Sequence, residues 1–222
     1  AVDVVIEVLD ARLPLSSANP VLQELIGTRP TVIALNKSDL ADPVVTEAWV
    51  RYFEKQGRPA ALLNAVDGKG IRNLIQKAKQ AGAPALEKLT RKGLRPRPVR
   101  VMIMGIPNVG KSSLVNRVVK GALTKTGDKP GVTRGRQWIR VDSDVDLLDT
   151  PGILPPSLPN QQSALLLGIC GAIKDTIYDS GEAGLELIRQ LEIRYPGKLQ
   201  QRYLQGGAFA GNTPEEELER AA

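Results

Sequence analysis

The spacing of apolar and polar residues predicts alternating strands and helices through the first half of the chain. Four short apolar runs have the length of buried strands: residues 2–9, 31–36, 60–65 and 99–104. Apolar residues recur at helical spacing in three more polar segments: residues 18–27, 44–56 and 70–81. This alternation favours an α/β fold, in which right-handed crossovers connect the strands of a mostly parallel sheet flanked by helices.

The alternation stops after residue 81. Residues 82–98 contain three prolines within a basic run, which predicts a linker with one or two helical turns and favours a solvated surface over an RNA-binding one. A further pair of strands is predicted at 137–142 and 145–149.

The last part of the chain has helical spacing. Helices are predicted over residues 162–205, and a final helix start at 212–220 has Thr213 as its N-cap. We therefore expect two domains, residues 1–158 and a small all-helical domain at 159–222.

Composition narrows the possible chemistry. The 222 residues are 42% hydrophobic, enough for a substantial core, yet no apolar run is long enough to cross a membrane. One cysteine and no histidine exclude a disulfide framework, a cysteine-based zinc site and a histidine base within this sequence. The first residues read as a strand without an initiator Met, which suggests that further residues precede them.

Charge is distributed unevenly along the chain. The net charge is +6, with 24 basic and 15 acidic residues in 1–154 but 6 and 9 in 155–222. A basic body favours a polyanionic partner such as nucleic acid, although a merely well-solvated surface explains the charge equally well.

A phosphate loop is the strongest motif. Residues 105–113 read GIPNVGKSS and match G-x-x-x-x-G-K-[ST], with a predicted strand before and a predicted helix after. Backbone N–H groups and the helix N-terminus of such a loop bind phosphate oxygens. Lys111 is expected to reach the β- and γ-phosphates, and the Ser112 hydroxyl to bind Mg²⁺.

The phosphate loop alone does not choose between ATP and GTP, and two later segments extend the site. DTPG at 149–152 follows a strand about forty residues after the phosphate loop. Asp149 is expected to serve Mg²⁺, and the Gly152 N–H to meet the γ-phosphate. Between the phosphate loop and DTPG, Thr133 is expected to offer a second hydroxyl to Mg²⁺ from a switch loop that the γ-phosphate orders.

The tetrapeptide NKSD at residues 36–39 predicts guanine recognition. Asp39 can accept two hydrogen bonds from guanine that adenine does not offer, while Asn36 and Lys37 brace the base and the phosphate loop. About thirty residues later, Asn64 and Ala65 resemble the loop whose backbone N–H, here at Ala65, meets guanine O6.

This tetrapeptide normally follows the phosphate loop, yet here it precedes it by almost seventy residues. An accidental match in an ATP-using protein is the alternative, but the segment ends an apolar strand, where α/β sheets bind ligands. The parts of a GTP site are therefore present in rotated order, as in a circularly permuted chain.

A family resemblance follows from these motifs taken together. The segments DVVIEVLDARLPLSSANP, NKSDL, GIPNVGKSSLVN, KPGVTRG and DTPGIL resemble the YlqF/RbgA family of circularly permuted GTPases, densely over residues 1–155. The resemblance implies a circularly permuted Ras-like P-loop GTPase domain followed by a small helical domain. A permuted family that acts on the small subunit carries a Cys/His zinc module, which this composition excludes.

The resemblance also assigns roles to residues. GTP or GDP would be held by Gly105, Pro107, Asn108, Val109, Gly110, Lys111, Ser112 and Ser113. Mg²⁺ would be served by Ser112, Thr133 and Asp149, and catalysis by Lys111, Thr133 and Gly152. Asn108 would either coordinate K⁺, as in potassium-stimulated relatives, or brace its own loop.

One position departs from Ras-like enzymes. Ile153 stands where a water-orienting Gln follows DxxG, and an isoleucine cannot polarise water. Family members are thought to use a histidine from a segment before the first strand, and this sequence contains none. Slow hydrolysis alone, stimulated by ribosomal particles, is therefore expected.

The function that the resemblance implies is a GTP-hydrolysing assembly factor for the large ribosomal subunit, switching between GTP and GDP states on pre-ribosomal particles. Its partners would be the large-subunit precursor and ribosomal RNA, met by a basic face within residues 111–140. The protein would be a cytoplasmic monomer that needs no membrane. The alternative is a GTP/GDP-sensing RNA-binding scaffold with negligible intrinsic hydrolysis.

Overall fold

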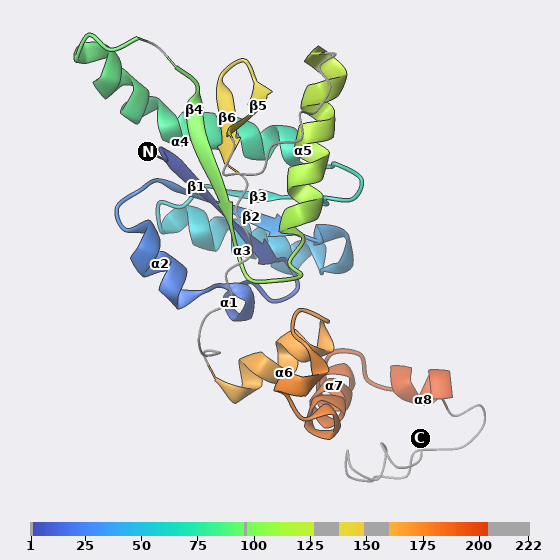
Figure 1. The fold of residues 1–222 in the computed structure, drawn as a ribbon. Coiled ribbons are helices and arrows are strands. Elements are labelled where there is room, and N and C mark those ends of the chain that lie inside the picture. The colour runs from blue at the N-terminus through green and yellow to red at the C-terminus, as the bar shows by residue number, and fades with distance from the viewer. Residues whose placement is uncertain (1, 96, 127–137, 149–159, 204–222) are drawn as a thin grey trace. The chain divides into compact units, whose positions relative to one another are not determined.

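The computed structural model describes residues 2–95, 97–126, 138–148 and 160–203. The chain divides into two compact units, Ala1–Pro156 and Ser157–Ala222. The first contains a six-stranded sheet in the order β3-β2-β1-β4-β6-β5 (Figure 1). Its strands are β1 (Val4–Asp10), β2 (Thr31–Asn36), β3 (Ala60–Leu62), β4 (Val99–Met104), β5 (Trp138–Asp142) and β6 (Val145–Leu148).

All pairings in this sheet are parallel except that of β5 with β6. The predicted parallel sheet and the predicted strand pair near residues 137–149 are therefore confirmed. The helices of this unit are α1 (Pro14–Ser17), α2 (Pro20–Ile26), α3 (Pro43–Lys55), α4 (Ile71–Arg91) and α5 (Lys111–Thr126), with a 3-10 turn η1 (Ser38–Leu40). The short α1 was not predicted.

The centre of the sheet is β1, which is buried along its whole length. One face of the sheet packs against α4, where Gly82 lets the helix approach Val4 and Val99 closely; a Cβ there would lie 2.5 Å from a methyl of Val99. On the other face, β1 contributes Val5 to a cluster with Ile26 of α2. This two-sided burial explains why the strands read as continuous apolar runs.

The prediction for residues 82–98 was wrong over its first half. Helix α4 does not end near residue 81 but continues through Pro84 to Arg91. A proline inside a helix costs about 3 kcal/mol, because it removes a hydrogen bond and crowds the preceding turn. The apolar stripe of α4 continues past Pro84 with Leu86 and Leu89, both partly buried, and its packing offsets that cost. Only residues 92–98 form the connection.

The second unit contains only helical elements among its described residues, 160–203. They are α6 (Gln161–Ile169), η2 (Asp175–Ile177), α7 (Ser180–Arg194) and α8 (Lys198–Tyr203). Asn160 caps α6 by accepting from the Ser163 N–H, and Asp179 caps α7 by accepting from the Glu182 N–H. The predicted helix start at Thr213 lies outside the described residues. No described helix has the length and apolar character to cross a membrane.

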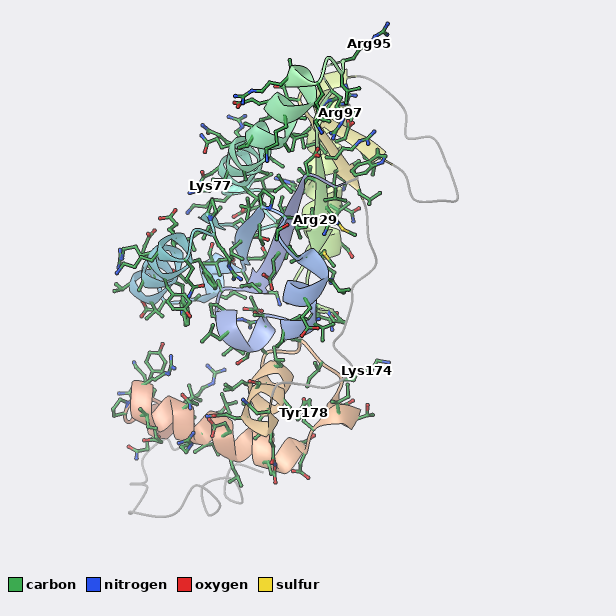
Figure 2. The ribbon with its side chains drawn as sticks, turned by 90° about the vertical axis from the view of Figure 1, so that its left-hand side faces the viewer. Arg29, Lys77, Arg95, Arg97, Lys174 and Tyr178 are labelled. Carbon is green, nitrogen blue, oxygen red and sulfur yellow. The ribbon has the colours of Figure 1, made fainter. Side chains whose placement is uncertain are left out.

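An ion pair fastens the connection 92–98 to the sheet. Arg97 donates to both carboxylate oxygens of Asp3, at 2.6 and 2.9 Å, and the Arg100 N–H donates at 2.9 Å. Figure 2 shows Arg97 lying against the strands, whereas Arg95 extends away from the ribbon. Burial alone would raise the pKa of Asp3, but the hydrogen bonds from Arg97 and Arg100 outweigh it, so that this pKa is lowered.

Replacing Asp3 with asparagine is expected to lower the free energy of unfolding by about 2 kcal/mol at pH 7, because a hydrogen-bonded charge pair is lost. The folded pKa lies below the unfolded value of 3.8, so the contribution is present above that value and is lost as pH falls through the folded pKa. Urea unfolding at pH 7 and at a series of pH values below 3.8 measures this. Asp144→Asn is the control, since its pair with Lys79 is exposed; an equal loss in both variants would contradict the prediction.

Candidate nucleotide-binding site

Three parallel strands end side by side at one edge of the sheet. These are β2 at Asn36, β1 at Asp10 and β4 at Met104, and the register pairs Asp10 with Asn36. The carboxyl edge of a parallel sheet is where α/β proteins bind their ligands. The two sequence motifs predicted to share a site therefore leave the sheet at the same edge.

The phosphate loop connects β4 to the N-terminus of α5 (Figure 1). Gly105 lies against β1, where a Cβ would be 2.6 Å from the Val8 carbonyl oxygen. Gly110 has a φ of +100°, which side-chain-bearing residues rarely adopt. Ser112 and Ser113 are exposed in the first turn of α5, where helix N–H groups are available to an anion.

Lys111 begins α5 and is buried. Its Nζ donates to the Ile106 carbonyl oxygen at 2.5 Å, so that the ammonium lies across the loop that it belongs to. Burial lowers the pKa of Lys111, because the charged form loses water. An anion held by the loop would restore a favourable environment for this charge, which is the property expected of a phosphate-binding lysine.

Asn36 joins the two motifs directly. Its side-chain Nδ2 donates to the Val109 carbonyl oxygen at 2.7 Å, and its Oδ1 accepts from the Ala65 N–H at 3.0 Å. The contact is so close that a Cβ on Gly110 would lie 2.1 Å from Asn36 Nδ2. The structure thus brings residues 36–39, the phosphate loop and the loop at 64–68 together through one buried side chain.

Asp39 lies in the 3-10 turn η1 and is exposed, so its carboxylate is accessible to a base. The chain reaches this turn through Lys37, whose φ of 59° is left-handed. Among the described residues, the other non-glycine residue with positive φ is Asn108 of the phosphate loop. Such backbone costs on the order of 1 kcal/mol and is concentrated at functional sites.

The loop at 64–68 is organised from within and from α5. Asn64 Oδ1 accepts from the N–H groups of Val66 and Asp67 at 2.8 and 3.3 Å. Arg117 of α5 donates to the Asp67 carbonyl oxygen. In this structure the Ala65 N–H donates to the Asn36 side chain. Ala65 therefore supports the NKSD segment, and its N–H is not freely available to guanine O6.

Sequence reasoning missed Asp10 and Arg12. The Asp10 carboxylate is 1% exposed and lies 3.1 Å from Lys37 Nζ, and Arg12 donates to both of its oxygens. Burial alone would raise the pKa of Asp10, but hydrogen bonds from Arg12 and Lys37 outweigh it and lower this pKa. The available signal was that Asp10 directly follows the apolar run 2–9, the predicted strand that precedes the strand ending in NKSD.

Four predicted site residues, Thr133, Asp149, Gly152 and Ile153, lie outside the described residues. The described part still fits a nucleotide di- or triphosphate. It offers glycines that admit backbone close to a ligand, a buried ammonium, an exposed carboxylate at Asp39 and the exposed Ser112 hydroxyl for a divalent cation. Asn108 adds an exposed side chain on the same loop.

Comparisons with known proteins agree with this geometry. The family model described as 50S ribosome-binding GTPase matches residues 100–179. Ribosome biogenesis GTPase A from Bacillus pumilus is 43% identical over 202 residues, which cover 91% of this chain and 72% of the relative. Its counterpart from Bacillus cereus is 45% identical, covering 91% and 68%.

Solved structures extend the match to the fold. YlqF, bound to GDP in one structure and to GNP in another from T. maritima, has a TM-score of 0.62 in both. The identities are 27% and 26%, and the alignments cover 99% of this chain and 87% and 85% of the others. The chain therefore belongs to the ribosome biogenesis GTPase A family, the YlqF/RbgA group of circularly permuted GTPases.

Proposed function

We propose that this protein is a GTP-hydrolysing assembly factor for the large ribosomal subunit. The observation that carries the proposal is the bridge from Asn36 to Val109 and Ala65, because it makes one site from a guanine motif and a phosphate motif in permuted order. The names of the Bacillus relatives supply the ribosomal context. We propose that the protein acts in the cytoplasm as a monomer.

Within this site each residue has a separate task. Asp39 accepts from guanine N1 and N2. Adenine is excluded because it does not offer this pair of donors and would cover the carboxylate without satisfying it. Lys111 leaves the Ile106 carbonyl to meet phosphate oxygens. Ser112, Thr133 and Asp149 would hold Mg²⁺, which would supply positive charge beside the phosphate oxygens. Gly152 offers its N–H to the γ-phosphate, and Asn108 would either hold K⁺ or brace its own loop.

Hydrolysis by the isolated chain is proposed to be slow. Ile153 offers no polar atom to orient water, and no histidine is present in the sequence to replace it. The ribosomal particle then completes the active site or orders the switch segment that contains Thr133. The second candidate is a scaffold that senses GTP and GDP without turnover. Ile153 favours it as well, because a site that does not orient water hydrolyses GTP slowly.

Ribosomal RNA is the proposed ligand of the basic face within residues 111–140. Among the described cations of this face, Arg117 donates to the Asp67 carbonyl oxygen, and Arg140 pairs with Asp146 at 2.5 Å. Lys120 is exposed on α5. The remaining cations of this face lie where no side chain is described: Lys125, Lys129, Arg134 and Arg136.

A single set of measurements tests the proposal. GTP, GDP and ATP are titrated into the protein with Mg²⁺, and GTP turnover is followed with and without purified large subunits at low and at high salt. We expect guanine preference by orders of magnitude, slow turnover alone, and stimulation by large subunits that high salt removes, because phosphate contacts release counterions.

Each contrary result has a distinct meaning. Equal binding of ATP would remove the guanine site and with it the proposed function. Guanine preference without stimulated turnover would favour the scaffold. Stimulation that does not depend on salt would leave the GTPase intact but exclude phosphate contacts as the main link to the particle.

A further inference from the structure

The carboxylate of Asp10 has four donors although it lies outside both nucleotide motifs. Arg12 donates from its backbone N–H, Nε and Nη2 at 3.1, 2.9 and 2.7 Å, and Lys37 Nζ lies 3.1 Å from Oδ2. The Arg12 guanidinium and Lys37 ammonium are each about a quarter exposed, whereas Asp10 is 1% exposed. The pair with Lys37 therefore joins the end of β1 to the guanine motif at residues 36–39.

The backbone around Asp10 is fixed as firmly as its side chain. The Asp10 N–H donates to Ser17 Oγ at 2.9 Å, and the Ala11 N–H donates to the Asn36 carbonyl oxygen at 2.8 Å. Ser17 Oγ in turn donates to the Leu13 carbonyl oxygen at 2.7 Å. Because these contacts hold both ends of the turn, the carboxylate is a fixed point rather than a mobile counter-ion.

Lys37 is the residue that needs a fixed point. Its left-handed backbone, with φ of 59° and ψ of 35°, turns the chain out of β2 and into η1, which contains Asp39. Lysine has no intrinsic preference for this conformation, unlike glycine or asparagine. The Leu40 N–H donates to the Lys37 carbonyl oxygen at 3.0 Å, and the Ser38 N–H to Leu63 at 3.2 Å. These two bonds hold the backbone that leaves Lys37, whereas the contact with Asp10 holds the Lys37 side chain.

We propose that Asp10 is a positioning residue for guanine selectivity: its carboxylate holds the Lys37 side chain, and so keeps the left-handed turn that presents Asp39 to the base. This proposal rests on the proposed guanine site and assigns a role to a residue outside its motifs. A simple structural ion pair at the end of β1 is the competing explanation, and it predicts a loss of stability without a change in base preference.

The chain contains a matched control for that explanation. Asp3 also lies at an end of β1, is 9% exposed, and receives two bonds from an arginine and one from a backbone N–H. These partners, Arg97 and Arg100, lie outside the nucleotide motifs. Asp10→Asn and Asp3→Asn therefore remove the same kind of buried charge from opposite ends of one strand. Asp10→Glu, which keeps the charge but moves it, is the milder variant if Asp10→Asn does not fold.

The test measures the affinities of the full chain for GDP, ADP and pyrophosphate by calorimetry. We expect Asp10→Asn to weaken GDP binding about tenfold, to reduce the ratio of GDP to ADP affinity equally, and to leave pyrophosphate binding within about twofold. Asp10→Glu shows the same pattern with a smaller change. Asp3→Asn leaves all three affinities within about twofold while lowering the unfolding midpoint.

A double-mutant cycle then asks whether Asp10 acts through Lys37. In a Lys37→Met background, the Asp10→Asn change is expected to have no further effect on GDP affinity, whereas independent contributions would add. Additive effects, equal losses for GDP and pyrophosphate, or unchanged base preference in the Asp10 variants would each overturn the proposal. A wild-type protein that binds ADP as well as GDP would instead remove the guanine site itself.

Discussion

Replacing Asn36 with alanine is expected to weaken GDP binding by about a hundredfold, because two buried hydrogen bonds of about 1–3 kcal/mol each are lost at the junction of the site. The Val109 carbonyl oxygen loses its donor at 2.7 Å, and the Ala65 N–H loses its acceptor at 3.0 Å. Both groups are buried, so water does not replace the amide without rearrangement of the phosphate loop or of the loop at 64–68.

Calorimetric titration of GDP measures this loss, and urea unfolding shows how much of it falls on stability instead. Asn116→Ala is the control, since Asn116 is an exposed asparagine on α5 just beyond the phosphate loop. Asn36→Asp is a second variant of the same size, which places a carboxylate against a carbonyl oxygen and is expected to be at least as damaging. A GDP affinity within about threefold of wild type for both Asn36 variants would show that the bridge is incidental.

The second large effect is expected at Lys111. Lys111→Met should lower kcat/KM for GTP by about a hundredfold to a thousandfold, the usual cost of removing one preorganised charge from a developing phosphate charge. Methionine retains most of the buried side-chain volume, so the change tests the ammonium rather than packing. The lost donor to Ile106 is a secondary cost and acts on the empty loop.

Turnover in the presence of large subunits measures this effect, because stimulated rates leave room for a thousandfold decrease. Lys88→Met is the control, as Lys88 is an exposed lysine on α4. GTP affinity is measured alongside, since binding should weaken as well. A variant that hydrolyses GTP within about threefold of wild type would exclude Lys111 from phosphate stabilisation.

The outline of the fold could be predicted because strands buried on both faces read as apolar runs, and helices between them read as amphipathic stripes. Pro84 shows the limit of that reading. Its local preference is to end a helix, yet α4 continues through it to Arg91, with Leu86 and Leu89 partly buried beyond the proline. At such positions tertiary packing outweighs the local conformational preference, and the sequence alone does not show where this happens.

The motifs of the site could be predicted from the sequence, but the hydrogen bonds and ion pairs that connect them could not. The phosphate loop and NKSD each have a fixed spacing, and both follow strands, so their meeting at one sheet edge could be expected. The partner of Lys37 is set by which strand lies beside β2, and that is a matter of topology. Asp10 occupies that place because β1 runs parallel to β2 with Asp10 opposite Asn36.

The bridge from Asn36 to Val109 also has a consequence for biosynthesis. The two residues are separated by 73 positions, and the asparagine is translated first. At ordinary elongation rates its acceptor follows roughly 4 to 15 s later, and until then β1 lacks β4 as its neighbour in the sheet. The nascent chain thus completes its base-recognition segment well before it can hold phosphate. Nucleotide arriving during translation finds a competent site only late, when α5 has left the exit tunnel.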